Sequence, residues 1–124
     1  MQLDAIVRRR FTELAEKAER LAAARERTDS GSFTIPAAPF YEWVTNVQSL
    51  LARACGQESV HYQNFIRLAN RFTSYEAEFA NCRAVFVAAR EDYEGGYLFN
   101  VRAAAKAEAL AQSRQLLAAG AKEP

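Results

Sequence analysis

The sequence predicts an all-α fold, a bundle of four or five antiparallel helices in one domain spanning residues 1–124. Apolar residues recur every three or four positions in several long segments, which is the period of a helix. No segment combines sustained apolar and polar alternation with β-branched residues, the pattern typical of strands. Half of the 124 residues are hydrophobic, so a chain of this length can bury a core of its own.

The first predicted helix covers residues 2–28, because one apolar stripe repeats at spacings of four, three, four and three. The stripe comprises Val7, Phe11, Leu14, Ala18 and Leu21, with Leu3 and Ile6 at its border. Arg8 and Arg10 flank the stripe on opposite sides, whereas Arg9 faces outward. This arrangement favours interhelical ion pairs over a single basic surface.

Residues 28–39 are rich in Pro, Gly and Ser and are interpreted as a loop inside the domain. We expect the second helix to begin at Pro39, a residue favoured at the first helical position, and to end near Cys55, before Gly56. Its apolar arc comprises Phe40, Trp43, Val44, Val47, Leu50, Leu51 and Ala54. Tyr41 lies off this arc, so we expect its ring to be exposed.

Ser59 is a natural cap for a third helix, which is expected to bury Tyr62, Phe65, Ile66, Ala69 and Phe72. The segment from Thr73 to Glu76 has the form of a capping box that starts a fourth helix, or else the third helix continues through it. The fourth helix has the most regular seam in the chain: Tyr75, Phe79, Cys82, Phe86, Ala89 and Tyr93. Gly95 and Gly96 interrupt it.

A fifth helix is predicted over residues 97–119, where alanine gives a high helix propensity. One of its sides carries Leu98, Val101, Ala105, Ala109 and Leu116. Leu110 and Leu117 lie about 100° round the helix from that side. A helix with two apolar sides needs two neighbours, so Leu110 and Leu117 are candidate interface residues, together with the exposed Tyr41.

Charge and composition argue against several classes of protein. Sixteen basic and fifteen acidic residues leave a net charge of +1, which provides no long-range field for nucleic acid or an anionic membrane. No apolar run approaches the roughly 18 residues that a membrane span needs. The N-terminus has charged residues after a very short apolar stretch, the reverse of a secretory signal, so we expect a cytoplasmic protein.

The sequence predicts no catalytic residue, metal site or cofactor site. Cys55 and Cys82 lie at apolar positions without a CxxC pair and are expected to be core thiols. His61 has no positioned acid at helical spacing, which indicates a structural hydrogen bond rather than a general base. The acidic run at residues 91–94 is interpreted as a solvated face, although acids near the end of a helix oppose its dipole and would be relieved by a basic partner.

An alternative hypothesis is a nucleic-acid-binding or nucleolytic role. Arg67 and Arg71 lie four apart in the third helix and could hold a phosphate as a pair, with His61 nearby in the same helix. Stacking on bases would need exposed aromatic rings among basic residues, and the aromatic residues fall mostly on buried arcs.

A longer pattern is similar to a known module: Phe40-x-x-Trp43-x-x-x-Val47-x-x-Leu50-Leu51, then Gly56-x-x-Ser59-x-His61-Tyr62-x-x-Phe65, Gly96-Tyr97-Leu98, Ala107-Glu108 and Leu116-Leu117-x-x-Gly120. It resembles a helical module of uncharacterised bacterial proteins, some with TIR-like or nuclease-like effectors in phage defence and some with HEPN-like continuations. The similar proteins generally continue past the position of Gly120, so the chain is either a naturally short version or the N-terminal part of a longer protein.

No catalytic residue is carried over from this resemblance. A HEPN ribonuclease would show an arginine and a histidine with four to six residues between them, whereas Arg53 lies eight positions before His61. We therefore expect a non-catalytic interaction or oligomerisation module that binds a protein partner or its own copies, with a place in a bacterial defence system as the resemblance implies.

Overall fold

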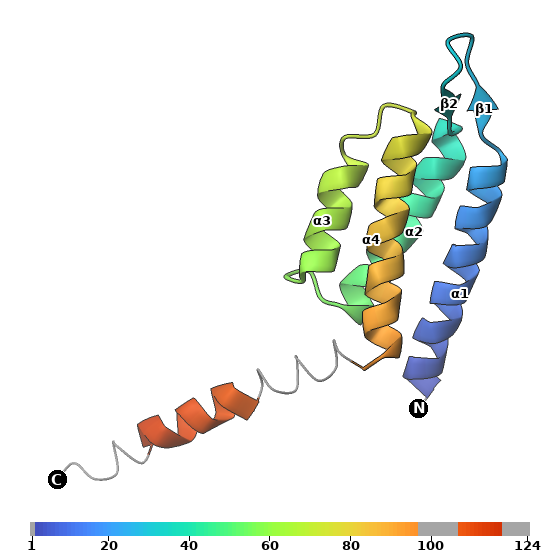
Figure 1. Ribbon diagram of the computed structural model, residues 1–124. Coiled ribbons are helices and arrows are strands. Elements are labelled where there is room, and N and C mark those ends of the chain that lie inside the picture. The colour runs from blue at the N-terminus through green and yellow to red at the C-terminus, as the bar shows by residue number, and fades with distance from the viewer. Residues whose placement is uncertain (1, 97–106, 118–124) are drawn as a thin grey trace.

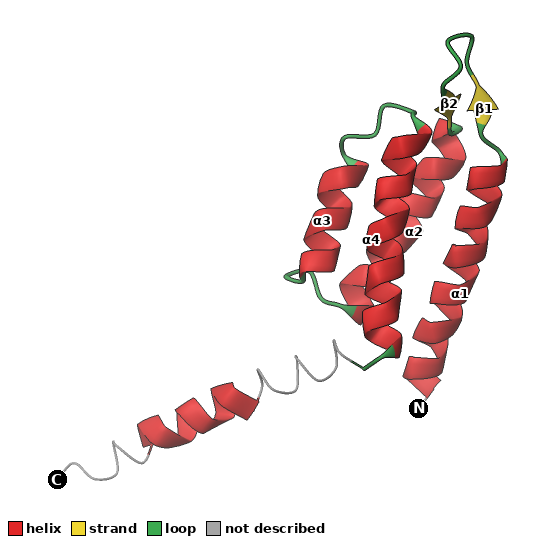
Figure 2. Ribbon diagram, viewed as in Figure 1, coloured by secondary structure: helices red, strands yellow, loops and turns green. Residues whose placement is uncertain are grey.

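The computed structural model describes residues 2–96 and 107–117. Four helices form what is called here the body: α1 (Gln2–Ala23), α2 (Ala37–Ala54), α3 (Val60–Ala69) and α4 (Glu76–Glu94). Each is antiparallel to the next, so α4 ends beside the start of α1 (Figure 1). A further helix at residues 107–117, the distal helix, extends away from the body (Figure 1). The predicted all-α fold is confirmed, with one short two-stranded ribbon beside the helices (Figure 2).

The core lies where the apolar faces of the four helices meet. Every residue of the stripes predicted for α1 and α2 is buried. Trp43 sits among three phenylalanine rings at centroid distances of 5.3 to 5.7 Å: Phe65, Phe79 and Phe86. Its indole N–H donates to the Leu14 carbonyl oxygen at 2.9 Å. Because a buried indole N–H needs an acceptor, this bond fixes α2 against α1 as well as satisfying the ring.

A β-hairpin lies between α1 and α2. α1 ends at Ala23, so the first strand of the hairpin falls in residues that were predicted as helix, whereas the second strand falls in the predicted loop. β1 (Glu26–Arg27) pairs antiparallel with β2 (Phe33–Thr34), in a register that places Glu26 opposite Thr34. Strands of two residues are too short to show an alternating pattern, which is why the sequence did not indicate them.

The hairpin is fastened to the start of α4. The Arg25 guanidinium lies 4.0 Å from the centre of the Phe33 ring and donates from Nη1 to Glu76 Oε1 at 3.0 Å. The Ile35 N–H donates to the Ser74 carbonyl at 2.8 Å. These contacts hold the hairpin against the start of α4.

The second helix begins earlier than predicted. α2 starts at Ala37, with Pro36 as its N-cap, so the expectation that helix begins at Pro39 is wrong. Pro39 instead lies in the first turn, where backbone N–H groups have no intrahelical partner, so its missing N–H forfeits no bond. At the other end Gly56 has a φ of +91°, the left-handed stop expected of it.

α3 and α4 are separate helices, which answers the question that the sequence left open. Ser74 has a φ of +112° between them, a conformation that ends the helical path. The capping acid is Glu78 rather than Glu76, since its carboxylate accepts the Thr73 N–H at 2.8 Å and the Tyr75 N–H at 2.9 Å.

The predicted seam of α4 is buried at Phe79, Cys82, Phe86 and Ala89. Tyr75 is exposed, contrary to the prediction, because it is the N-cap and precedes the helical path. Ile66 on α3 is only partly buried, also contrary to the prediction, since α3 is a short outer helix.

Candidate interaction surface

The distal helix forms from residues with strong helix propensity: alanine, leucine, glutamate, glutamine and arginine, with one serine. All eleven of its residues are exposed, with Leu110 at 51% and Leu116 and Leu117 at 75% each. The predicted interface residues therefore present apolar side chains to solvent. Three residues assigned to the other apolar side lie outside the described residues: Leu98, Val101 and Ala105.

Tyr41 is exposed at 51%, as predicted, but it does not join the distal helix in one surface. It is the fifth residue of α2, at the hairpin end of the body, whereas the distal helix extends from the opposite end (Figure 1). One edge of its ring packs on Phe72, with centroids 5.9 Å apart. Tyr41 and the leucines thus belong to separate surfaces.

A groove of about 320 Å³ lies between α1 and α2, beside the start of α1. Leu3, Ile6, Val7 and Leu50 supply its apolar lining, and Leu3 and Ile6 are exposed at 67% and 61%. Arginines stand at its rim together with Glu13. The sequence placed Leu3 and Ile6 at a stripe border, but the groove depends on the spacing of two helices, which a single helical pattern does not reveal.

His61 is paired with an acid from another helix. Its Nε2 lies 2.7 Å from Asp92 Oδ2, and its side chain is 18% exposed. Ser59 caps α3 as predicted, because its Oγ accepts the Tyr62 N–H at 3.1 Å. The contact between His61 and Asp92 therefore joins the start of α3 to the last turn of α4. A structural hydrogen bond was expected for this histidine.

The partner of His61 was missed because it lies 31 residues along the chain. The available signal was the acidic run at the end of α4, which has no basic residue in its last turn. Acids in that position oppose the helix dipole, so a cationic or hydrogen-bonding neighbour was to be expected from another helix.

A second contact joins the last turn of α4 to α1. The Tyr93 hydroxyl donates to Asp4 Oδ1 at 2.6 Å, and Arg8 Nε donates to Asp4 Oδ2 at 2.8 Å. These bonds hold the pKa of Asp4 below its usual value of 3.8. Burial, together with the bond to the Asp4 carboxylate, raises the pKa of Tyr93 to about 12.

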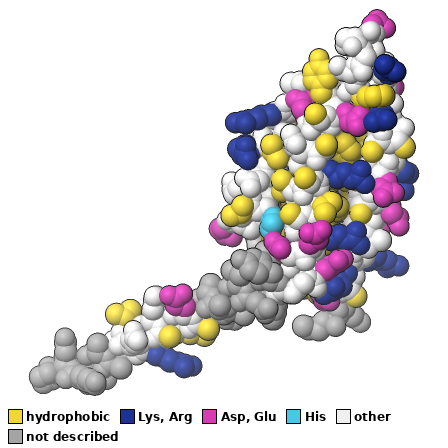
Figure 3. Space-filling model, viewed as in Figure 1, with side chains coloured by type: hydrophobic (Ala, Val, Ile, Leu, Met, Phe, Trp, Pro, Cys, Tyr) yellow, Lys and Arg dark blue, Asp and Glu magenta, His cyan; other side chains and the backbone are white. Residues whose placement is uncertain are grey.

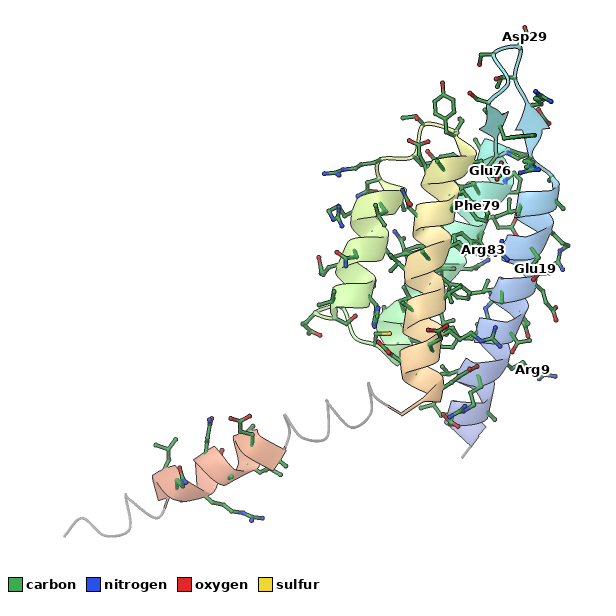
Figure 4. All side chains as sticks on the ribbon, in the orientation of Figure 1. Arg9, Glu19, Asp29, Glu76, Phe79 and Arg83 are labelled. Carbon is green, nitrogen blue, oxygen red and sulfur yellow. The ribbon has the colours of Figure 1, made fainter. Side chains whose placement is uncertain are left out.

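The arginine run of α1 does not form the interhelical ion pairs that we predicted. Arg8 pairs with Asp4, and Arg10 Nη1 pairs with Glu13 Oε2 at 2.9 Å, both within α1, where residues three or four apart are neighbours. Arg9 extends away from the bundle, as predicted (Figure 4). Interhelical ion pairs form at other residues: Arg83 on α4 lies 3.8 Å from Glu19 on α1 (Figure 4), and Lys17 on α1 lies 3.5 Å from Glu42 on α2.

Arg67 and Arg71 do not share a helical face. α3 ends at Ala69, so Arg71 lies in the connection to α4, whereas Arg67 donates to Asn64 Oδ1 at 3.3 Å. The prediction that they stand four apart on one helix is therefore wrong. Basic and acidic side chains are also interspersed over the face of the body seen in Figure 3. Neither observation favours nucleic-acid binding.

The two thiols are buried as predicted. Burial and the nearby Glu78 charge raise the pKa of Cys82 to about 11, which suppresses the thiolate needed for nucleophilic chemistry. Within residues 2–96 and 107–117, no three His, Cys, Asp or Glu side chains gather as metal ligands.

Comparisons with protein families, with curated proteins and with solved structures find no match to this chain. None of the helices in the described part of the chain is long and apolar enough to cross a membrane. The surface features themselves must therefore support any functional assignment.

Proposed function

We propose that this chain is a non-catalytic helical interaction module that associates with its own copies or with another protein through the distal helix. The exposure of Leu110, Leu116 and Leu117 on a helix with no buried residue carries the proposal. Isolated helices of this length are marginal in water, so docking would both stabilise the helix and remove its leucines from solvent.

The apolar surface on offer is sufficient for a modest complex. Burying about 400 Å² of apolar surface per protomer would contribute about 10 kcal/mol at 25 cal/mol/Å², before the entropy of association is subtracted. With an association cost of about 4 kcal/mol, about 6 kcal/mol would remain, which corresponds to a dissociation constant on the order of tens of micromolar.

The resemblance over residues 38–120 supports a place for the module as an accessory domain or subunit of a bacterial defence system. The apolar residues of α2 and α3 that carry the resemblance are buried in the core, so the chemistry of such a system would reside elsewhere. A docking role fits a module that positions another domain.

The test is self-association of the full chain, measured by light scattering and sedimentation at rising concentration. The double variant Leu110→Ser/Leu117→Ser should remain monomeric at high micromolar concentration while keeping its helical circular dichroism. A matched control, Val60→Ser/Val87→Ser, changes two exposed aliphatic residues of the body and should associate like the wild type. Association of the double variant as strong as that of the wild type would contradict the proposal.

A further inference from the structure

We infer that the groove between α1 and α2 receives the distal helix of a second copy, so that two chains exchange helices in a closed dimer. This inference rests on the proposed function, which concerns only the distal helix, and adds the surface that accepts it. The groove is the place where the body leaves two neighbouring aliphatic side chains, Leu3 and Ile6, largely in solvent above a buried floor.

The two surfaces match in length. The part of α1 that lines the groove runs from Leu3 to Glu13, ten residue steps or about 15 Å of helix. The distal helix, residues 107–117, also spans ten steps, and Leu110 and Leu117 lie about 10 Å apart along it. Both leucines of one copy can therefore contact the groove of another at the same time.

The groove also has the composition of a protein interface. Its apolar lining is bordered by polar side chains of α2, Asn46 and Ser49, and by arginines. Three arginines line the groove as well: Arg9, Arg10 and Arg53. Arg10 is paired with Glu13, and the Arg9 side chain is 81% exposed. The distal helix carries one acid and one base, Glu108 and Arg114, so the contact should be driven by apolar burial rather than charge.

The buried area favours a reciprocal exchange. A helix face and its groove would each bury about 400 Å², giving about 800 Å² for one docked helix, which is the size of a crystal contact. Two docked helices bury about 1,600 Å², the usual size of a specific complex. Exchange between two copies also uses both grooves and closes the assembly, so it does not propagate into fibres.

The experiment compares three full-length variants by sedimentation and light scattering. Ile6→Glu places a charge in the groove, Leu117→Glu places one on the distal helix, and Val60→Glu is the control, an aliphatic residue of α3 that is 71% exposed and outside the groove. The wild type and Val60→Glu should dimerise alike, even at molar salt. Each of the other two should raise the dimer dissociation constant at least 100-fold, with the thermal midpoint unchanged when all proteins are diluted until they are monomeric.

Mixing Ile6→Glu with Leu117→Glu should give a heterodimer that is weaker than the wild-type dimer but stronger than the dimer of either variant alone, because one helix and one groove remain intact in that pair. Dimers of Ile6→Glu as strong as the wild type, with Leu117→Glu monomeric, would overturn the groove inference and leave the proposed function standing. A monomeric wild type whose thermal midpoint falls in Leu117→Glu would mean that the helix docks within its own chain. Dissociation of the wild-type dimer by salt would overturn the inference, because it would mean that charged side chains rather than apolar ones hold the two copies together. Should Ile6→Glu fail to fold, Leu3→Glu makes the same test nearer the helix end.

Discussion

The body and the distal helix use leucine in opposite ways. In the body Leu14 and Leu51 have no exposed surface, whereas Leu110 and Leu117 expose half or more of theirs. Both regions are helical, so helix formation and burial have separate causes. The distal helix has a high helix propensity but no buried residue, while each body helix has an apolar stripe that faces a neighbour.

The same comparison separates stability from association. Substitutions in the body should change the free energy of unfolding, and substitutions in the distal helix should change the dissociation constant of a complex. Substitutions in the body can therefore be ranked by how much core packing, or how many hydrogen bonds that hold the elements in place, each one removes.

The largest effect is expected for Trp43→Ala, which should lower the free energy of unfolding by about 3–5 kcal/mol. The substitution removes the ring at the centre of the core together with its bond to the Leu14 carbonyl. Chemical denaturation followed by circular dichroism measures it. Tyr41→Ala is the control. Tyr41 lies only two residues before Trp43 but is exposed at 51%, so its loss should cost about 0.5 kcal/mol or less. Equal losses would mean that α2 is rotated from the register described.

The core was the most predictable part of the molecule. The spacing of apolar residues identified all seven buried positions that α2 carries, because burial along a helix follows its period. The errors came at the ends of elements. The start of α2 and the exposure of Tyr75 depend on which residue caps a helix, and caps are set by a few bonds that periodicity does not record.

A smaller loss is expected for Glu78→Ala, about 1–2 kcal/mol, because its carboxylate accepts the Thr73 and Tyr75 N–H groups that open α4. Burial raises the pKa of Glu78, but the donors from Thr73, Tyr75 and Ser74 outweigh it and hold that pKa below 4.5. The contribution is therefore present above the ordinary carboxyl pKa and is lost as the pH falls through the lowered one. Denaturation of both proteins between neutral and acid pH should show their difference shrinking, and Glu78→Gln, which keeps an acceptor, should lose less.

Ser74→Gly should stabilise the body by about 0.5–1 kcal/mol. A serine at a φ of +112° is strained by its Cβ, and glycine relieves that strain, although part of the gain is offset by the greater freedom of glycine in the unfolded chain. Thermal unfolding measures the change. Ser74→Ala keeps the Cβ and serves as the control, and a gain of equal size in that variant would show that the backbone strain is not the cause.

The candidate surface was less predictable than the core. The sequence indicated the leucines of the distal helix, since an apolar residue without a partner is visible in one helical pattern. It could not indicate the groove beside Leu3 and Ile6, nor the pairing of His61 with Asp92, because both depend on how two helices lie together. Contacts between elements distant in the chain leave no periodic trace, so only the structure reveals them.

An effect as small as that of Ser74→Gly is expected at the last turn of α4, which holds α1. Tyr93→Phe removes the hydroxyl that bonds Asp4 and should lower the free energy of unfolding by about 0.5–1 kcal/mol at neutral pH.

The contribution of Tyr93 should also depend on pH. The pKa of tyrosine in the unfolded chain is near 10, whereas burial and the Asp4 carboxylate raise the pKa of Tyr93 to about 12. The raised value favours the folded protein fully below pH 10, and that stability is lost as the pH rises through 12. The pKa of Cys82 is raised to about 11, so its contribution to stability is lost over a similar pH range. That loss is the same in both proteins and cancels when they are compared. The advantage of the wild type over Tyr93→Phe should therefore shrink between pH 10 and 12 in denaturation experiments, and a difference that stays constant over this range would mean that Asp4 and Tyr93 do not hold α1 to α4 in solution.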